Sequence, residues 1–192
     1  MSKVILGPSV IFYPLPTVLV GANIEGKANF TAVAWCGVVN SSPPMISVSL
    51  YHTRYSLKGI RQSGTFSINI PSVDYVNETD YCGMVSGADT DKASDCKFNV
   101  FYGNLETAPL IEQFPVNIEC RVFTEMDLGS HVLIIGQLNE VYVTSDCLTN
   151  GNPDVAKIRP FLWVARPGND YYDFGKPIGK AFISGEKIKA AK

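Results

Sequence analysis

Apolar and polar residues alternate in several short runs of this chain, and the alternation predicts β-strands. Turn sequences such as NIEGK and NSSPP bound the runs, as is typical of strands that meet in hairpins. Leu57 and Ile60 lie three residues apart and Gly64 follows them, which predicts a short helix that ends at the glycine. In the first third of the chain the runs cover residues 17–22, 27–39, 45–50 and 65–70.

The remainder of the chain returns to strands after one irregular segment. Residues 75–98 contain few large apolar side chains and predict one short helix followed by an exposed polar loop. The runs 116–126 and 131–144 flank the turn DLGS and predict a hairpin with a bulge at Gly136, and residues 161–165 predict one more strand. About seven strands with antiparallel connections and few helices indicate a mainly β (α+β) fold, a closed or partly closed barrel.

Composition and charge limit the classes of protein that fit this pattern. The chain has 192 residues, 46% of them hydrophobic and 18% charged, as in ordinary globular proteins, so we expect one domain over residues 1–192. A net charge of −2 disfavours nucleic acid or an anionic membrane as the main partner. The sequence opens with no secretory leader, and no apolar run approaches the ~20 residues of a membrane helix, so we expect a cytoplasmic protein.

Motifs of the common catalytic classes are absent from the sequence. It contains no G-x-G-x-x-G, G-x-x-x-x-G-K-[ST], G-x-S-x-G or H-E-x-x-H, so doubly wound dinucleotide binding, P-loop chemistry, serine hydrolysis and zincin chemistry are unsupported. Five cysteines without a C-x-x-C pair and two histidines disfavour a zinc or iron–sulfur site, and the odd count fits reduced thiols. We therefore expect no metal, and a protein whose own side chains are poor in nucleophiles and bases.

The run 27–39 is unusual for a buried strand because it has few large side chains. Small residues there would let a flat ligand lie against the backbone, while Asn29 and Thr31 supply hydrogen-bonding groups at its edge. An aromatic heterocycle with a polar rim fits such a strand. The alternative is a strongly bent strand whose small residues ease its curvature. The small residues are Ala28, Ala32, Ala34 and Gly37.

A second candidate is the stretch SLYHTRYS, residues 49–56, which joins a strand to the expected helix. Hydroxyl groups, an arginine and the N-terminus of a helix together make a seat for a phosphate group. The alternative is a solvated loop between strand and helix. The polar residues concerned are Ser49, His52, Thr53, Arg54 and Ser56.

Two further candidates lie later in the chain. Ser86, Gly87 and Lys92 of the stretch SGADTDK could hold phosphate or ring oxygens, and the alternative is a plain polar loop. His131 begins a strand after a glycine turn, where a lone histidine is usually an exposed residue at the edge of a strand.

Taken in order, these stretches resemble the flavin reductase-like, FMN-binding split-barrel family, and most closely its flavoredoxins. The resemblance runs from about residue 10 to residue 185, over nearly the whole chain. Each motif is loose, but the ordered set is specific. The matching stretches are PLPTVLVGANIEGKANFTAVAWCGVVNSSPPMISVSLYHTRYSLKGIRQSGTFSINIP, YCGMVSGADTDKASDCKF, GSHVLIIGQL and YYDFGKPIGKAF.

The resemblance implies a Greek-key split β-barrel of about six strands with short flanking helices, and a homodimer. It also implies non-covalent FMN near the subunit boundary, with the ring along residues 29–35 and the phosphate on the 49–56 stretch. His131 matches the histidine that related reductases place near the nicotinamide, and is the expected catalytic residue. The expected cofactor-binding residues are Asn29, Phe30, Thr31, Ala32, Val33, Ala34, Trp35, Ser49, Leu50, His52, Arg54, Ser56, Ser86 and Lys92.

The implied activity is that of an FMN-dependent oxidoreductase. Electrons would pass from NAD(P)H or a redox protein through FMN to a flavin, metal or protein acceptor. A flavin brings its own hydride chemistry, which agrees with the scarcity of nucleophiles and bases in the chain. One alternative is an FMN-binding electron carrier that does not oxidise NAD(P)H, and another is a split barrel that has lost its flavin and binds a different planar cofactor.

Overall fold

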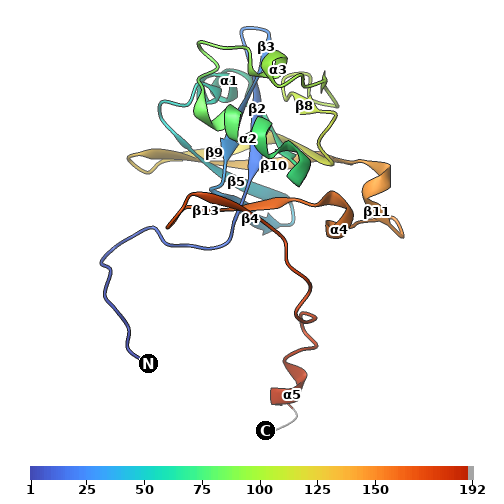
Figure 1. Ribbon diagram of the computed structural model, residues 1–192. Helices are drawn as coiled ribbons and strands as arrows, with labels where there is room; N and C mark the ends of the chain where they lie inside the picture. Colours follow the sequence, from blue (N-terminus) through green and yellow to red (C-terminus); the bar gives the residue numbers. More distant parts are fainter. Residues whose placement is uncertain (190–192) are drawn as a thin grey trace.

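β-strands form most of the regular structure in residues 1–189, the part of the chain that this computed structural model describes (Figure 1). Residues 190–192, at the end of the expected domain, lie outside it. The strands are β1 (Leu15–Pro16), β2 (Val18–Ile24), β3 (Lys27–Val33), β4 (Cys36–Ser41), β5 (Pro44–Tyr51), β6 (Thr65–Ile70), β7 (Val100–Phe101), β8 (Leu110–Ile111), β9 (Val116–Asp127), β10 (His131–Val143), β11 (Leu148–Thr149), β12 (Asn152–Pro153), β13 (Phe161–Val164) and β14 (Asp170–Asp173). The helices are α1 (Ser56–Ser63), α2 (Val76–Met84), α3 (Lys92–Asp95), α4 (Val155–Ile158) and α5 (Glu186–Lys189), with 3-10 turns η1 (Val73–Tyr75) and η2 (Ser145–Cys147).

The largest sheet has seven strands in the order β3-β2-β6-β9-β10-β5-β4, and its neighbouring strands are antiparallel. Its two edge strands, β3 and β4, are joined only by Ala34 and Trp35. The three Cα steps from Val33 to Cys36 span at most about 11 Å, whereas a flat seven-stranded sheet would hold its edges about 29 Å apart. The sheet must therefore curl until its edges approach each other, and the expected split barrel is confirmed.

Apolar side chains form two cores, one on each face of the curled sheet. Strand β2 shows the division, because Val18 and Val20 belong to the core inside the barrel while Leu19 belongs to the second core. Phe66 and Ile134 fill the barrel interior. The second core lies under α2 and contains Leu19, Phe30, Cys82, Phe98, Ile111 and Phe114.

Helix α1 confirms the helix and the glycine stop expected after the 49–56 stretch. Its Leu57 and Ile60 are buried against the barrel. Gly64 follows the last turn with a φ of 67°, and its N–H donates to the carbonyl of Ile60. A left-handed residue at this position suits glycine best, so the sequence ends the helix there.

Two expectations about the first half of the chain are wrong. The run 27–39 is not one buried strand, because it breaks at Ala34–Trp35 where the chain crosses from one sheet edge to the other, and β4 is largely exposed. The segment 75–98 is not one helix and an exposed loop: it contains α2 and the short α3, and Lys92 of α3 is only 3% exposed. Local sequence patterns do not report this burial, since it arises from packing against the sheet.

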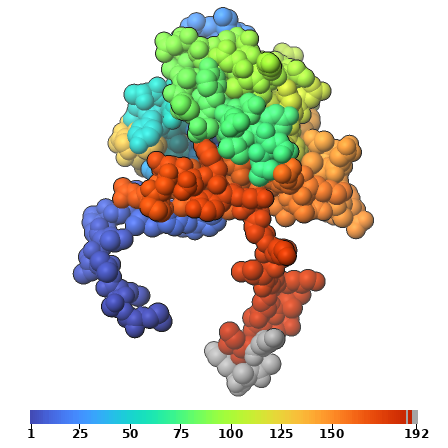
Figure 2. Space-filling model, in the orientation of Figure 1, coloured from blue at the N-terminus to red at the C-terminus, as the bar shows by residue number. Residues whose placement is uncertain are grey.

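The second half of the chain forms the expected β9–β10 hairpin, with a register shift between Ile135 and Gly136 that confirms the bulge. Strand β13 is also confirmed, and it pairs with β1 and β14 in a three-stranded sheet. Figures 1 and 2 show this sheet across the body below α2, and show residues 1–14 and 174–189 extending away as two arms. Within residues 1–189 no helix is long and apolar enough to cross a bilayer.

Candidate functional site

Two adjoining cavities lie between the barrel and the α2 region, and the C-terminal sheet borders the first of them. The first, which we call the aromatic cavity, has a volume of about 410 Å³. The second, the polar cavity, has a volume of about 310 Å³, and both are lined by Tyr51, Arg54 and Met84. The aromatic cavity is also lined by Thr17, Ala32, Val33, Ala34, Trp35, Ser49, Leu50, Asp80, Gly83, His131, Trp163, Asn169 and Tyr171. The polar cavity is also lined by Asn29, Thr31, Thr53, Tyr55, Ser56, Val85, Ser86, Gly87 and Lys92.

The polar cavity is positively charged. Arg54 and Lys92 are its cations, and none of the described residues that line it is acidic. Helix α1 begins at the cavity at Ser56, with no acidic residue in its first turn and, among the described residues, no side chain capping its first N–H groups. A helix N-terminus with two nearby cations attracts an anion, and phosphate is one of the anions that such sites hold in proteins.

Buried polar atoms without a partner also face the polar cavity. Asn29 Nδ2 donates to Ser56 Oγ at 2.7 Å, but Asn29 Oδ1 and the hydroxyl of Thr31 have no hydrogen-bond partner among the described residues. Both residues are buried. Leaving such groups unpaired costs about 1–3 kcal/mol each, so the arrangement favours a ligand that supplies the missing partners.

The cations are held in place by backbone carbonyl groups. Lys92 Nζ donates to the carbonyls of Phe30 at 2.9 Å and Cys82 at 2.8 Å, which ties α3 to β3 and α2. Burial lowers the pKa of Lys92 from its ordinary value. Arg54 Nη1 donates to the carbonyl of Gly83 at 3.0 Å, so the guanidinium is fixed where the two cavities meet.

Gly87 makes room for Asn29 in the wall of the polar cavity. A Cβ atom at this glycine would stand 1.8 Å from Asn29 Oδ1, a distance that no side chain could tolerate. The close approach brings the 85–91 loop against β3, so segments far apart in sequence form one wall.

The aromatic cavity contains a stack of three rings. The His131 ring lies 4.5 Å from the ring of Trp35 and 3.9 Å from that of Tyr51, with interplanar angles of 27° and 35°. The stack follows from strand pairing, because His131 of β10 stands directly opposite Tyr51 of β5. His131 Nδ1 lies 2.9 Å from Ser130 Oγ.

His131 is not the exposed edge residue that its place in the sequence suggests. It is 8% exposed, and burial, followed by the charge of His52, lowers its pKa below the ordinary value of 6.5. Both effects favour the neutral imidazole, and Trp35 and Tyr51 fix the orientation of its ring.

The C-terminal sheet closes one side of the aromatic cavity. The hydroxyl of Tyr171 on β14 donates to Asp80 Oδ1 on α2 at 2.8 Å. Burial and the neighbouring Asp80 raise the pKa of Tyr171, so this phenol keeps its proton. Trp163 and Asn169 of the same region complete the wall.

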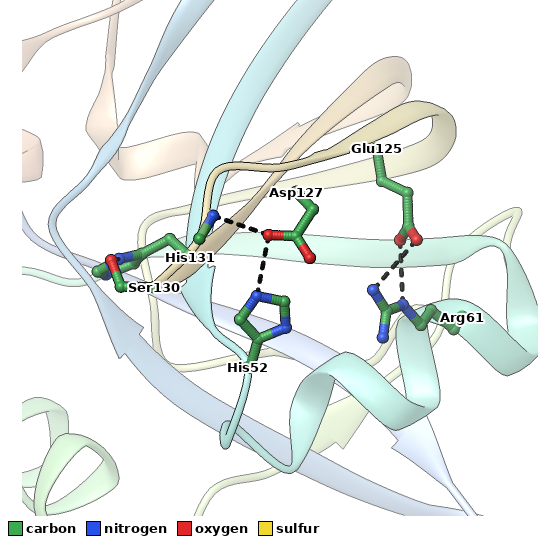
Figure 3. A network of polar contacts seen from close by, with 7 residues as sticks. His52, Arg61, Glu125, Asp127, Ser130 and His131 are labelled. Carbon is green, nitrogen blue, oxygen red and sulfur yellow. Dashed lines mark hydrogen bonds and ion pairs between the residues drawn. The ribbon is translucent and has the colours of Figure 1, made fainter.

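Two of the expected binding residues line neither cavity. The ring of Phe30 points into the second core, where it packs edge-on against Phe98. His52 extends to the end of the β9–β10 hairpin, where its Nε2 lies 3.2 Å from Asp127 Oδ1 (Figure 3). Arg61, in the last turn of α1, pairs with Glu125 on the same hairpin, so these contacts link the hairpin to α1 and to the loop before it (Figure 3).

The other expected residues do line the cavities. Asn29, Thr31, Ser56, Ser86 and Lys92 lie in the polar cavity. Ala32, Val33, Ala34, Trp35, Ser49, Leu50 and His131 lie in the aromatic cavity, and Arg54 lies in both.

Several lining residues were missed by the sequence reasoning. Tyr51 belongs to the SLYHTRYS stretch itself, and Tyr171 to the YYDFGKPIGKAF stretch, so their neighbours were a usable signal for both. Thr17 belongs in the same way to the PLPTVLVGA stretch, whereas Asp80 and Trp163 carry no such signal, because only the folded chain brings them to the cavity.

Comparison with known proteins gives consistent matches. A family model described as "Flavin reductase like domain" matches residues 11–166. The solved structure of a flavoredoxin from Methanosarcina acetivorans is 38% identical in sequence, with a TM-score of 0.93, and the match covers 98% of this chain and 100% of that one. The structure of the flavoredoxin of Desulfovibrio vulgaris (Miyazaki F) is 34% identical, with a TM-score of 0.89 and coverage of 96% and 100%. A flavin reductase of Pseudomonas putida is 25% identical over 122 residues, 64% of this chain and 68% of that protein.

Proposed function

The chain belongs to the flavin reductase-like domain family, and on this premise we propose that it is an FMN-binding oxidoreductase of the flavoredoxin type. In the proposed reaction electrons pass from NAD(P)H or a redox protein through bound FMN to a flavin, metal or protein acceptor. FMN, when bound, supplies the chemistry of electron and hydride transfer. The task of the protein is then to bind the cofactor, orient it and present one side of it to the donor.

The observation that carries the proposal is the meeting of two unlike cavities at Arg54. FMN joins a flat aromatic ring with a polar rim, through a ribityl chain, to a phosphate, and the aromatic and polar cavities match the ring and the phosphate in chemistry. The cavity volumes fall in the range of small-molecule sites. Arg54 lines both cavities, so it stands where the two parts of one ligand would join.

In the polar cavity, Arg54, Ser56, Ser86 and Lys92 would hold the phosphate. An arginine fork and hydroxyl groups form charge-assisted hydrogen bonds with phosphate oxygens. The unpaired oxygens of Thr31 and Asn29 would gain partners from hydroxyl and amide groups of the cofactor.

In the aromatic cavity, the small residues of the 32–34 segment leave the backbone accessible to a flat ring. We place His131 beside a nicotinamide donor. Because Ser130 engages Nδ1, Nε2 is the nitrogen proposed to face the donor. A neutral imidazole fixed between two rings can orient an amide or stabilise developing charge at little reorganisation cost.

We further propose that the protein is a homodimer. Edge strand β4 exposes Val38 and Val39, and the end of the β9–β10 hairpin exposes Phe123, Met126 and Leu128. The N-terminal arm exposes several more apolar side chains, among them Ile5 and Phe12. A second copy of the chain that covers these surfaces would bury the edge strand and the apolar side chains of the arm. Monomeric proteins rarely expose apolar surfaces and edge strands of this kind. Sedimentation of the purified protein tests this proposal.

The proposed location is the cytoplasm. It rests on the five cysteines, which are free thiols in the structure, since a reducing compartment maintains this state.

An anaerobic absorbance spectrum of the FMN-reconstituted protein tests the central proposal. Flavin bands that bleach on addition of NADH or NADPH are the expected result. Bands that persist until a chemical reductant is added would make the protein an electron carrier that awaits a protein donor. No FMN binding at all would refute the proposed function.

A further inference from the structure

Two cysteine sulfur atoms lie close together behind the polar cavity. Cys82 Sγ on α2 and Cys96 Sγ, immediately after α3, are 4.0 Å apart. Cys82 is fully buried in the second core, whereas Cys96 is half-buried and also contacts the carbonyl of Glu78 at 3.8 Å. The two sulfur atoms are in van der Waals contact, and a disulfide would require them to approach to ~2.05 Å.

The segment between these cysteines forms one wall of the polar cavity. Residues 83–87 line the cavities directly, and Lys92 reaches back to donate to the carbonyl of Cys82 itself. Movement of α3 away from α2 would therefore open the polar cavity. A covalent bond between the cysteines would prevent that movement.

We propose that Cys82 and Cys96 are a redox modification site that forms a reversible disulfide by exchange with a small-molecule disulfide. The bond holds the 83–95 segment against the barrel and slows the release of a phosphate-bearing ligand from the polar cavity. The bond itself depends only on the two thiols, while its effect on ligand release rests on the proposed FMN site.

The exchange proceeds in two steps that balance. The Cys96 thiolate attacks one sulfur of the small disulfide and releases one thiolate. The Cys82 thiolate then attacks the Cys96 sulfur and releases the second. The protein loses two protons and two electrons, and the oxidant leaves as two thiols. Cys96 reacts first because it is the more exposed of the pair.

Surrounding groups make the exchange slow at neutral pH. Burial raises the pKa of both thiols, and Glu78 of α2 and Asp95 of α3 act in the same direction on Cys96. Lys92 opposes this by lowering both values. Because the thiolate is the attacking species, disulfide formation is expected to accelerate as the pH rises from 7 to 9.

The test incubates the purified protein with glutathione redox buffers of increasing oxidising strength, followed by alkylation and peptide mass analysis. The expected result is a cross-linked peptide pair containing Cys82 and Cys96, reversed by dithiothreitol. Cys96→Ser should abolish it, and Cys147→Ser, a matched change at another half-buried cysteine, should leave it intact. Two thiols that stay reduced, or a glutathione adduct on Cys96 that never resolves, would overturn the proposal.

A second measurement tests the consequence of the bond. A disulfide that closes a loop of about 15 residues should raise the thermal midpoint by about 5 °C or more. Release of FMN from the oxidised protein should be roughly tenfold slower than from the reduced protein, since local opening becomes rarer. Equal release rates of FMN from the oxidised and reduced protein would contradict the proposed effect of the disulfide on ligand release. Failure to bind FMN in either state would refute the proposed function and leave the cross-link result standing.

Discussion

The polar cavity and the aromatic cavity adjoin, yet the chain assembles them in different ways. The polar cavity is built from short segments within residues 29–92, including one continuous strand-to-helix stretch. The aromatic cavity also requires His131 of the β9–β10 hairpin and the region 163–171, close to the other end of the chain. The polar cavity is therefore complete within residues 29–92, whereas the aromatic cavity exists only once segments near both ends of the chain have folded together.

The two cavities also differ in how they would hold a ligand. The polar cavity offers two cations, a helix N-terminus and unpaired buried oxygens, so charge and hydrogen bonding dominate. The aromatic cavity offers stacked rings around a neutral histidine, so shape and orientation dominate. Substitutions in the polar cavity are therefore expected to change FMN affinity, and substitutions in the aromatic cavity to change the rate of flavin reduction.

The largest effect is expected at Arg54, where the cavities meet. Arg54→Ala removes a charge-assisted contact of a class worth ~1.5–3 kcal/mol, so the dissociation constant for FMN should rise about 10- to 150-fold. Fluorescence titration of the apoprotein with FMN measures this dissociation constant.

Arg54→Lys is the matched control for this change. It keeps the positive charge but loses the planar fork that also holds the Gly83 carbonyl, so an intermediate affinity is expected. An unchanged FMN dissociation constant for Arg54→Ala would mean that the phosphate lies elsewhere. The proposed difference in function between the two cavities would then be wrong.

His131→Asn is expected to separate rate from affinity. Loss of the stacked imidazole should slow anaerobic flavin reduction by NADH or NADPH about tenfold, equivalent to ~1.4 kcal/mol of barrier. The FMN dissociation constant should change less than about twofold, because the residue lies outside the polar cavity. Stopped-flow absorbance gives the rate, and an equal loss of binding and rate would assign His131 a structural role.

The same variant should alter the pH dependence of stability. The folded pKa of His131 lies below the unfolded value of about 6.5, so between these two values the unfolded chain binds more protons. Stability therefore rises with pH through that window and is lost as the pH falls below about 6.5. Urea unfolding of His131→Asn between pH 5 and 7 should show a flatter profile than the unmodified protein, and identical profiles would contradict the assigned shift.

Thr31→Val should move stability and affinity in opposite directions. Valine has nearly the shape of threonine, and it removes a buried hydroxyl that has no hydrogen-bond partner within residues 1–189. The apoprotein should gain about 1 kcal/mol in the free energy of unfolding, while FMN binding should weaken by about two- to tenfold as one hydrogen bond is lost. Thermal unfolding and titration of the same preparation measure both.

Two other buried threonines with unpaired hydroxyls serve as controls. Thr17 lines the aromatic cavity and Thr79 lies in neither cavity. Thr79→Val should stabilise the protein without changing FMN affinity, and Thr17→Val should affect affinity less than Thr31→Val. If all three variants lowered FMN affinity equally, the losses would reflect altered packing. The hydroxyl group of the polar cavity would then have no distinct role in FMN binding.

The sequence predicted much of the polar cavity because its chemistry is local. The strand is followed by a stretch rich in hydroxyl groups and then by a helix. This order along the chain puts Arg54 and Ser56 at the helix N-terminus, however the helix packs against the rest of the protein. Alternation along β3 explains why Asn29 and Thr31 share a wall while Phe30 points to the opposite core. The expectation that the flavin ring lies along all residues from 29 to 35 did not take into account that successive side chains of a strand point to opposite faces.

The aromatic cavity was less predictable because tertiary contacts build it. No pattern near Trp163 or Tyr171 indicates that β13 pairs with β1 and β14 with β13, or that this sheet borders the aromatic cavity. The break at Ala34–Trp35 arises because the two edges of the sheet must meet, and a short-range reading of the run cannot detect it. The polar cavity has a tertiary part as well, because the burial of Lys92, which was found as a candidate, depends on the carbonyls of Phe30 and Cys82 from other segments.

The smallest effect is expected at His52, the other histidine of the chain. The sequence placed it with the phosphate, but its side chain pairs with Asp127 at the end of the hairpin and lines neither cavity. The pair is 40% and 69% exposed, so His52→Asn should change stability by less than about 0.5 kcal/mol and the FMN dissociation constant by less than about twofold. Because the charge of His52 lowers the pKa of His131, the variant should also move that pKa upward, visible in an NMR titration of the imidazole. A loss of affinity comparable to that of Arg54→Ala would return His52 to the phosphate site and extend the polar cavity around the start of α1.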